Sequence, residues 1–240
     1  LWHQGVERGV DPELNPDVES VSPSGLAGDA SPRGRALQTG ELAPLAEQYA
    51  TAALNARNAG FDAVELHGAH GYLLDQFLWE RTNVRADGYG GSATDRVRFP
   101  VEVVRAVRAA VGPDFPILYR FSQWKQADYA ATLANTPAEL ERLLEPLVEA
   151  GVDVFHPSTR RHYVPAFPDL EGVDGQLSLA GWTKRVTGLP AIAVGSVGLQ
   201  TEFKPSEVRD IEPAPVEAVL RQFANSEFDV IAVGRALLSD

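Results

Sequence analysis

Short apolar segments alternate with helical patterns along most of this chain. The helical patterns cover residues 41–58, 97–111, 137–149, 178–187 and 213–225. The apolar segments cover residues 61–67, 115–121, 152–157, 190–195 and 228–234. Strands that are almost continuously apolar and are joined through helices form parallel sheets with helices packed on their faces. The alternation therefore predicts an α/β fold built on a parallel sheet.

One phrase recurs where a helix runs into a strand. Residues 59–64 read Ala-Gly-Phe-Asp-Ala-Val, residues 150–155 read Ala-Gly-Val-Asp-Val-Phe, and residues 227–231 form a looser copy. Residues 5–40 lack this pattern and are rich in Gly, Pro, Ser, Asp and Glu, so we expect a long irregular loop there. We expect residues 1–240 to form a single domain.

Two architectures fit the alternation, a closed (β/α)₈ TIM barrel and an open doubly wound sheet. No Gly-x-Gly-x-x-Gly motif follows any predicted strand, which disfavours the dinucleotide-binding open sheet. Residues capable of chemistry stand near the ends of the predicted strands: His67, Arg120, His156 with Ser158, Gly195 with Ser196, and Gly234 with Arg235. In a barrel these ends meet at one rim, where the active site is built. The strand ends favour the TIM barrel.

Composition excludes several classes of partner. The chain has 21 Lys and Arg against 33 Asp and Glu, a net charge of −12, which argues against binding to nucleic acid or to anionic membranes. No apolar run is long enough to span a bilayer, and no secretory signal is visible. Without cysteine the redox compartment stays open, and we expect a cytoplasmic protein by default. A homo-oligomer is compatible with the sequence.

Two histidines and a tyrosine follow the first apolar strand. His67, His70 and Tyr72 offer imidazole and phenol groups that can hold a substrate oxygen and deliver a proton beside it. We expect both histidines to face one cavity because the chain can begin a helical turn just past the strand. A zinc site with Glu65 as third ligand is the competing interpretation, and packing alone is another. We predict no metal.

Fixed positive charge and glycine turns mark three further strand ends. Arg120 lies within an apolar strand, where it needs either an anionic ligand or an ion pair with an interior carboxylate. Gly195-Ser196 and Gly234-Arg235 follow the last two strands. Glycines there free backbone N–H groups, and barrels frequently bind phosphate in these loops. These residues predict a phosphorylated ligand, although plain turns would look the same.

Two loops complete the candidate site. Residues 160–163 form a basic and aromatic cluster after the strand at 152–157, and Tyr163 is our candidate for substrate contact there. A solvated loop is the alternative. Residues 83–92 are rich in glycine and are typical of a tight, well hydrogen-bonded connection.

The chain resembles the old yellow enzyme family over residues 41–240. The stretches that carry the resemblance are residues 67–78, 82–92 and 96–100, with Arg120-Phe121-Ser122, Val194-Gly195-Ser196 and Val233-Gly234-Arg235. The resemblance implies an eight-stranded TIM barrel that holds FMN. It also implies that NADH or NADPH reduces the flavin, which then reduces the C=C bond of an α,β-unsaturated carbonyl compound. The protein is thus expected to be an ene-reductase acting on a small-molecule enone or enal.

The same resemblance implies a role for each matching residue. His67 and His70 would bind the substrate carbonyl oxygen, and Tyr72 would protonate the α-carbon. Arg120 would lie at the N1/O2 edge of the flavin. The FMN phosphate would contact Gly195, Ser196, Gly234 and Arg235.

The match to the family is partial in length. Leu1-Trp2-His3 resembles the end of the third barrel strand, and neither two earlier strands nor a helix after the eighth strand is present. We therefore expect an incomplete barrel, from the end of strand 3 through strand 8, that belongs to a longer protein. A truncated fragment unable to hold flavin is one alternative. Another is a non-redox phosphate-binding barrel of the aldolase or isomerase type, but its usual strand-end lysine is not expected, because Lys125, Lys184 and Lys204 are predicted in loops or helices.

Overall fold

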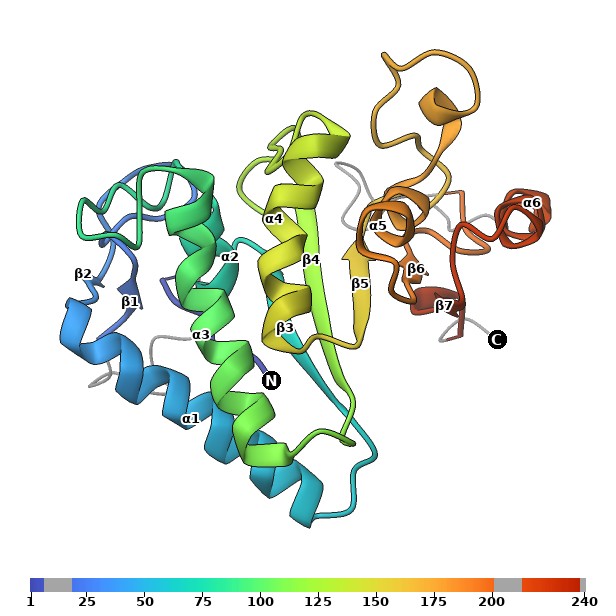
Figure 1. Cartoon of the computed structure of the whole chain (residues 1–240). Coiled ribbons are helices and arrows are strands. Elements are labelled where there is room, and N and C mark those ends of the chain that lie inside the picture. The colour runs from blue at the N-terminus through green and yellow to red at the C-terminus, as the bar shows by residue number, and fades with distance from the viewer. Residues whose placement is uncertain (7–18, 201–212, 238–240) are drawn as a thin grey trace.

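A parallel sheet of five strands forms the centre of the computed structural model, which describes residues 1–6, 19–200 and 213–237 (Figure 1). The strands are β3 (Val64–His70), β4 (Ile117–Lys125), β5 (Val154–Ser158), β6 (Ile192–Val194) and β7 (Val230–Ala232). They are hydrogen-bonded in chain order, β3-β4-β5-β6-β7. A doubly wound sheet would reverse its order at a switch point, so this order is that of a barrel.

The predicted helices are present and pack along the sheet (Figure 1). They are α1 (Thr39–Asn58), α3 (Ala93–Val111), α4 (Pro137–Ala150), α5 (Leu179–Thr187) and α6 (Glu217–Ala224). Ser92, Thr136 and Ser178 cap three of them, each accepting a hydrogen bond from a backbone N–H in the first turn. No helix among the described residues combines the length and the apolarity needed to cross a bilayer.

Several short elements were not predicted. Helix α2 (Leu73–Leu78) directly follows β3, and two-residue strands β1 (Val21–Ser22) and β2 (Arg35–Ala36) pair within the stretch predicted as loop. Two 3₁₀ turns, η1 (Asp174–Gln176) and η2 (Arg235–Leu237), lie late in the chain. Apart from β1 and β2, the described part of residues 5–40 up to Gln38 is irregular, while residues 7–18 lie outside the described residues.

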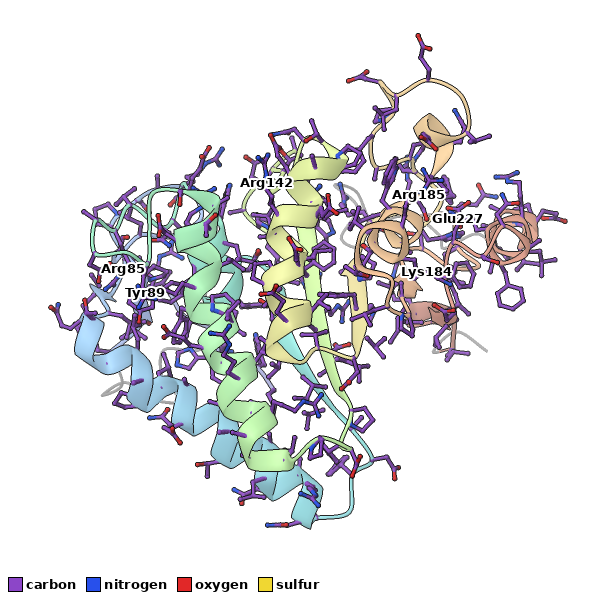
Figure 2. All side chains as sticks on the ribbon, viewed as in Figure 1. Arg85, Tyr89, Arg142, Lys184, Arg185 and Glu227 are labelled. Carbon is purple, nitrogen blue, oxygen red and sulfur yellow. The ribbon has the colours of Figure 1, made fainter. Side chains whose placement is uncertain are left out.

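The glycine-rich loop at residues 83–92 is held by many hydrogen bonds, as its sequence predicts. The Asn83 amide donates to the carbonyl oxygens of Phe77 and Tyr89, at 2.7 Å each. The Arg85 guanidinium donates to the carbonyl oxygens of Pro23 and Leu37. Figure 2 shows Arg85 beside β1 and β2. This loop therefore fixes the irregular N-terminal region against the barrel.

The apolar core lies between the sheet and its helices. On β4, Ile117, Tyr119 and Phe121 are buried in this core, whereas Leu118 and Arg120 are half-buried on the opposite face. Successive side chains of a strand point to opposite faces, so this alternation turns Arg120 away from the apolar core. The face that the helices leave uncovered carries the polar residues of the site.

Residues 1–3 extend the sheet beyond β3. The Leu1 nitrogen donates to the Glu65 carbonyl oxygen, and the Leu1 carbonyl accepts from the His67 N–H. These two bonds to residues on either side of Leu66 are the pattern of a parallel pair. The prediction that residues 1–3 end a neighbouring strand agrees with this. Among the described residues β7 pairs only with β6, so the barrel is incomplete, as predicted.

Candidate active site

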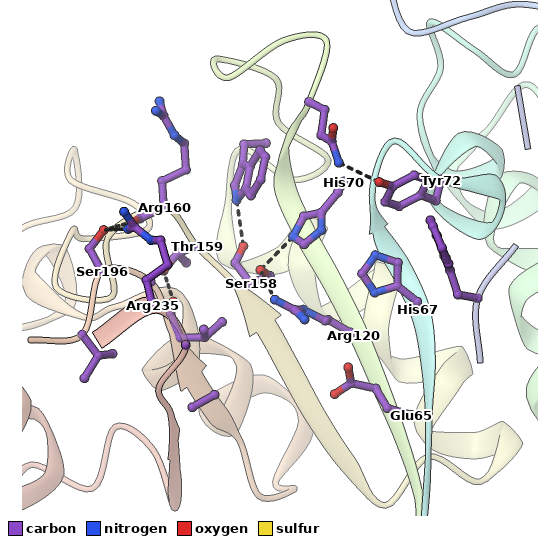
Figure 3. Close-up of a pocket in the computed structure, with 18 of the residues that line it drawn as sticks. Glu65, His67, His70, Tyr72, Arg120, Ser158, Thr159, Arg160, Ser196 and Arg235 are labelled. Atoms are coloured by element: carbon purple, nitrogen blue, oxygen red, sulfur yellow. Dashed lines mark hydrogen bonds between the residues drawn. The ribbon is translucent and has the colours of Figure 1, made fainter. Parts of the chain in front are cut away.

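A cavity of about 680 Å³ lies at the carboxyl ends of the five strands. It is lined by residues of all five strands and of the loops that follow them (Figure 3). The predicted site residues that line it are His67, His70, Tyr72, Arg120, Gly195, Ser196, Gly234 and Arg235. The structure thus brings eight of the nine predicted residues to one cavity.

His67 and His70 reach the same side of β3 through a β-bulge. Residues three apart in a regular strand would face opposite sides. The pairing register with β4 shifts between Gly68 and His70, and His70 has a positive φ of 65°. The two ring centroids lie 5.1 Å apart. The predicted helical turn is wrong, because both histidines belong to β3 and the bulge turns His70 inward.

Gly68 leaves room for a buried tyrosine behind the histidines. A Cβ atom at Gly68 would lie 2.3 Å from the Tyr119 hydroxyl oxygen. Tyr119 is fully buried, and its hydroxyl has no hydrogen-bond partner. Burial raises the pKa of Tyr119 well above its ordinary value. A glycine between the two histidines is therefore required by packing.

Both histidines are held neutral by burial. Burial first, and the Arg120 charge second, lower the pKa of His67 to about 4 and that of His70 to about 2. The His70 ring stacks on Trp124 with centroids 4.5 Å apart, and its Nε2 lies 2.8 Å from the Ser158 hydroxyl. A neutral imidazole has one N–H donor and one acceptor. These rings can donate hydrogen bonds without adding positive charge.

Tyr72 stands at the start of α2 with its phenol bound by a side chain that was not predicted. The Gln126 amide donates to the Tyr72 hydroxyl oxygen at 2.8 Å. The Tyr72 ring lies 5.4 Å from the His67 ring and 5.0 Å from the Trp2 ring, centroid to centroid. Because Gln126 donates, the phenol keeps its own hydrogen for another acceptor.

Arg120 lies beside the histidines with a buried N–H group that has no partner. Its Nη2 donates to the Ser158 hydroxyl at 3.0 Å, and its buried Nε has no hydrogen-bond partner. Burial lowers the pKa of Arg120, and the Glu65 charge opposes that shift. A buried N–H without a partner is uncommon in proteins, so it marks a place where a ligand acceptor fits.

Glu65 is the interior carboxylate nearest in kind to the ion-pair partner that the sequence analysis allowed for Arg120. It hydrogen-bonds to His156 Nδ1 at 2.6 Å and not to Arg120. Burial alone would raise the pKa of Glu65, but His156, followed by Arg120 and His67, outweighs it and the pKa is lowered. The described residues contain no group of three or more His, Cys, Asp or Glu side chains that could hold a metal ion.

The far end of the cavity is built from backbone turns and arginine. Gly195 and Ser196 have positive φ values of 135° and 48°. A Cβ atom at Gly195 would lie 2.5 Å from the Thr159 carbonyl oxygen, so only glycine fits. Arg235, at the start of η2, brings its Nη2 to 3.5 Å from the Ser196 hydroxyl. A guanidinium, a hydroxyl and a glycine turn are the groups that bind phosphate.

Tyr163 does not line the cavity. Its side chain is 42% exposed and packs edge-on against His162, with centroids 5.3 Å apart. Arg160 is the residue of this loop that reaches the cavity, with its guanidinium 3.9 Å from the centroid of the Tyr129 ring. Substrate contact by Tyr163 stays a prediction that this arrangement does not support.

Lys125 corrects one expectation from the sequence. It is the last residue of β4, not a loop residue, and its side chain is fully buried. Its Nζ lies 2.8 Å from Asp75 Oδ1 and 2.8 Å from the Ser122 carbonyl oxygen. Burial raises the pKa of Asp75 and lowers that of Lys125, while their mutual attraction opposes both shifts. Lys125 does not line the cavity, so it is not placed to act as an amine nucleophile there.

Comparison with known proteins identifies the family. The profile of the NADH:flavin oxidoreductase / NADH oxidase family matches residues 1–240. The chain belongs to this family. The family is the one that the sequence motifs predicted, and the predicted flavin-dependent oxidoreductase, with FMN and a nicotinamide reductant, agrees with it.

Curated relatives of the family are substantially longer than this chain. The NADH oxidase of Thermoanaerobacter brockii is 36% identical over 245 residues, which cover 100% of this chain and 34% of that protein. The NADPH dehydrogenase of Clostridium acetobutylicum is 33% identical over 224 residues, which cover 92% of this chain and 59% of that protein. The chain thus spans between one third and three fifths of these two relatives.

A solved structure in the family has the same fold. Morphinone reductase in complex with tetrahydroNAD superimposes with a TM-score of 0.72 at 26% sequence identity. The match covers 100% of this chain and 61% of that chain. The prediction of an incomplete TIM barrel is confirmed.

Proposed function

We propose that the protein is an FMN-dependent oxidoreductase that passes hydride from NADH or NADPH to the activated C=C bond of an α,β-unsaturated carbonyl compound. One observation carries this proposal. A single cavity has His67, His70 and Tyr72 on one side and a phosphate-type turn with Arg235 on the other (Figure 3). Arg120 lies between them.

The residues present fit FMN. Gly195, Ser196, Gly234 and Arg235 would hold its phosphate, and Arg120 would face the ring with its unpaired Nε. A fixed guanidinium stabilises a ring that gains negative charge on reduction. When bound, FMN supplies the hydride chemistry, and the protein supplies position and charge.

His67 and His70 would hold the carbonyl oxygen of the substrate. Both rings are neutral, because burial lowers their pKa values far below 7. Two N–H groups aimed at one oxygen stabilise the negative charge that develops on it as the β-carbon is reduced. Neutral donors also leave the cavity without extra buried charge.

Tyr72 would deliver the proton to the α-carbon. Its hydroxyl is oriented by Gln126, which donates a hydrogen bond to the phenol oxygen, so the hydroxyl hydrogen is directed toward another acceptor. A tyrosine O–H group can act as a general acid. The hydrogen-bond donors for the carbonyl oxygen and the proton donor for the α-carbon would thus lie side by side in one cavity.

Separate half-reactions test this proposal. Tyr72→Phe is expected to slow reoxidation of the reduced flavin by an enone by on the order of 10²–10⁴-fold, the usual worth of a general acid. Flavin reduction by NADPH should be unchanged. Tyr89→Phe removes a hydroxyl that binds Glu102 outside the cavity and serves as the control. Stopped-flow flavin absorbance measures both steps, and equal losses in both would refute the role of Tyr72.

Four further expectations accompany this function. A small-molecule enone or enal substrate, a cytoplasmic location, a homo-oligomeric state and the absence of nucleic-acid partners stay predictions from the sequence. The relatives' names mention both NADH and NADPH, so both reductants belong in the assay. A purified protein that is colourless and binds no added FMN would refute the proposal as a whole.

A further inference from the structure

Ser158 joins two residues of the candidate site through one buried hydroxyl. It is the last residue of β5 and is 2% exposed. Its Oγ lies 2.8 Å from His70 Nε2 and 3.0 Å from Arg120 Nη2 (Figure 3). The three side chains come from three neighbouring strands, β3, β4 and β5. Ser158 thus links the histidine on one strand with the arginine on the next.

The direction of these two hydrogen bonds follows from the chemistry of the groups. An arginine guanidinium only donates, so Arg120 occupies a lone pair of the Ser158 oxygen. The hydroxyl hydrogen of a buried serine needs an acceptor. Among the described residues, His70 Nε2 is the one acceptor that bonds to it. The hydroxyl therefore donates to His70, and Nε2 carries no proton.

The opposite arrangement leaves a hydrogen without a partner. If His70 Nε2 carried the proton, Ser158 would receive two donors and its own buried hydrogen would face no acceptor. Leaving a buried polar group unpaired costs more than a hydrogen bond contributes. The stacked Trp124 and the Ser122 hydroxyl, which accepts the His70 backbone N–H at 2.9 Å, hold the residue in place.

We propose that Ser158 is a positioning residue that fixes His70 as the tautomer with its proton on Nδ1. The ring is neutral because burial lowers the pKa of His70 to about 2, so it has one proton and the tautomer decides which nitrogen donates. His70 lines the cavity, and no described group bonds its Nδ1. Nδ1–H is therefore the donor that His70 offers to a ligand.

A consequence for catalysis rests on the proposed function. The carbonyl oxygen of the substrate would be bound by His70 Nδ1–H. Arg120 would polarise the Ser158 hydroxyl, which bonds the other nitrogen of the imidazole ring. Hydrogen bonds in such a chain strengthen one another. Ser158 would then act on the substrate through His70 without touching it.

Nuclear magnetic resonance tests the tautomer without any flavin. Long-range proton–nitrogen spectra of protein labelled at its five histidines distinguish a protonated ring nitrogen from an unprotonated one. His70→Gln assigns the His70 signals by their loss. The expected result is a protonated Nδ1 and an unprotonated Nε2 at His70. A protonated Nε2 in the wild-type protein would overturn the proposal.

Ser158 variants test the cause, with His162 as internal reference. His162 Nδ1 lies 2.6 Å from Gln222 Oε1, away from the cavity, so its signals report that each variant is folded. Ser158→Ala should move His70 toward the other tautomer, and Ser158→Thr, which keeps a hydroxyl, should restore it. Unchanged His70 signals in Ser158→Ala, with unchanged His162 signals, would refute the role of Ser158.

Kinetics of the FMN-loaded enzyme provide the second readout. Ser158→Ala should raise KM for an enone by about 3- to 10-fold, the worth of one weakened hydrogen bond. Ser158→Thr should recover most of that loss. If the protein proves to have no flavin chemistry, the proposed function fails, while the spectra still decide the tautomer.

Discussion

The buried ion pair between Lys125 and Asp75 gives a sharp prediction about stability. Both side chains are 0% exposed, and the Lys125 nitrogen lies 2.8 Å from the Asp75 carboxylate. The same carboxylate accepts the Gly71 N–H at 2.6 Å, directly before Tyr72. We predict that Lys125→Met strongly destabilises the protein, because methionine keeps the apolar stem but leaves a buried carboxylate without its cation.

The size of the effect follows from this geometry. Removing one partner of a fully buried ion pair costs about 3–5 kcal/mol, since the remaining charge can neither reach water nor find another cation. Native domains are stable by about 5–15 kcal/mol in total, so this loss is a large share. Replacing both charges, with Asp75→Asn and Lys125→Met, should cost far less, because asparagine still accepts the Gly71 N–H.

A second lysine provides a matched control. Lys184 lies 2.8 Å from Asp229, the same separation, but these side chains are 24% and 41% exposed. Lys184→Met should cost no more than about 1 kcal/mol, because exposed pairs are screened by water. Urea unfolding followed by tryptophan fluorescence measures all variants. Equal costs for Lys125→Met and Lys184→Met would show that burial does not govern the Lys125 pair.

Three further predictions concern the site. The folded pKa of His67 lies at about 4 against 6.5 for the free side chain, so the unfolded chain binds more protons between these values. The free energy of unfolding should therefore fall as the pH is lowered from 6.5 to 4, and His67→Gln should flatten that slope in urea titrations. Gly68→Ala should lower the free energy of unfolding by about 1–3 kcal/mol, because the added methyl group overpacks against a buried tyrosine hydroxyl. The control Gly40→Ala in α1, where a Cβ atom would meet nothing within 4 Å, should not destabilise the protein. Equal effects of the two substitutions would contradict the packing argument. Gln126→Leu should slow enone reduction and spare flavin reduction by NADPH in stopped-flow traces, and loss of both would show that the amide does more than orient Tyr72.

Much of the fold was readable because its signals are local. Apolar segments alternating with helical patterns predicted each of the five strands β3–β7 and their helices, with boundaries shifted by a few residues. The site residues at strand ends were also readable, because parallel strands bring their carboxyl ends to one edge. Arg120 lies inside β4, and strand alternation alone turns it away from the apolar core.

Other features depend on contacts between distant residues and could not be read from the sequence. The bulge that turns His70 inward depends on pairing of β3 with β4. The burial of Lys125 depends on Asp75, fifty residues away, and a polar Gln-Trp-Lys segment gives no sign of a continuing strand. Gln126 and Ser158 gain their roles from partners far away in the sequence, Tyr72 and His70, which no local motif encodes.

The central claim is that this cavity holds FMN, with its phosphate at the turn formed by Gly195, Ser196 and Arg235. Titration of the protein with FMN, followed by flavin fluorescence, tests it most directly. We predict saturable binding that Arg235→Met weakens by about 10- to 100-fold, the worth of a hydrogen bond to a charged group. The control Arg142→Met, on the exposed side of α4, should bind FMN like the wild-type protein. Absence of saturable binding, or unchanged affinity in Arg235→Met, would contradict the account.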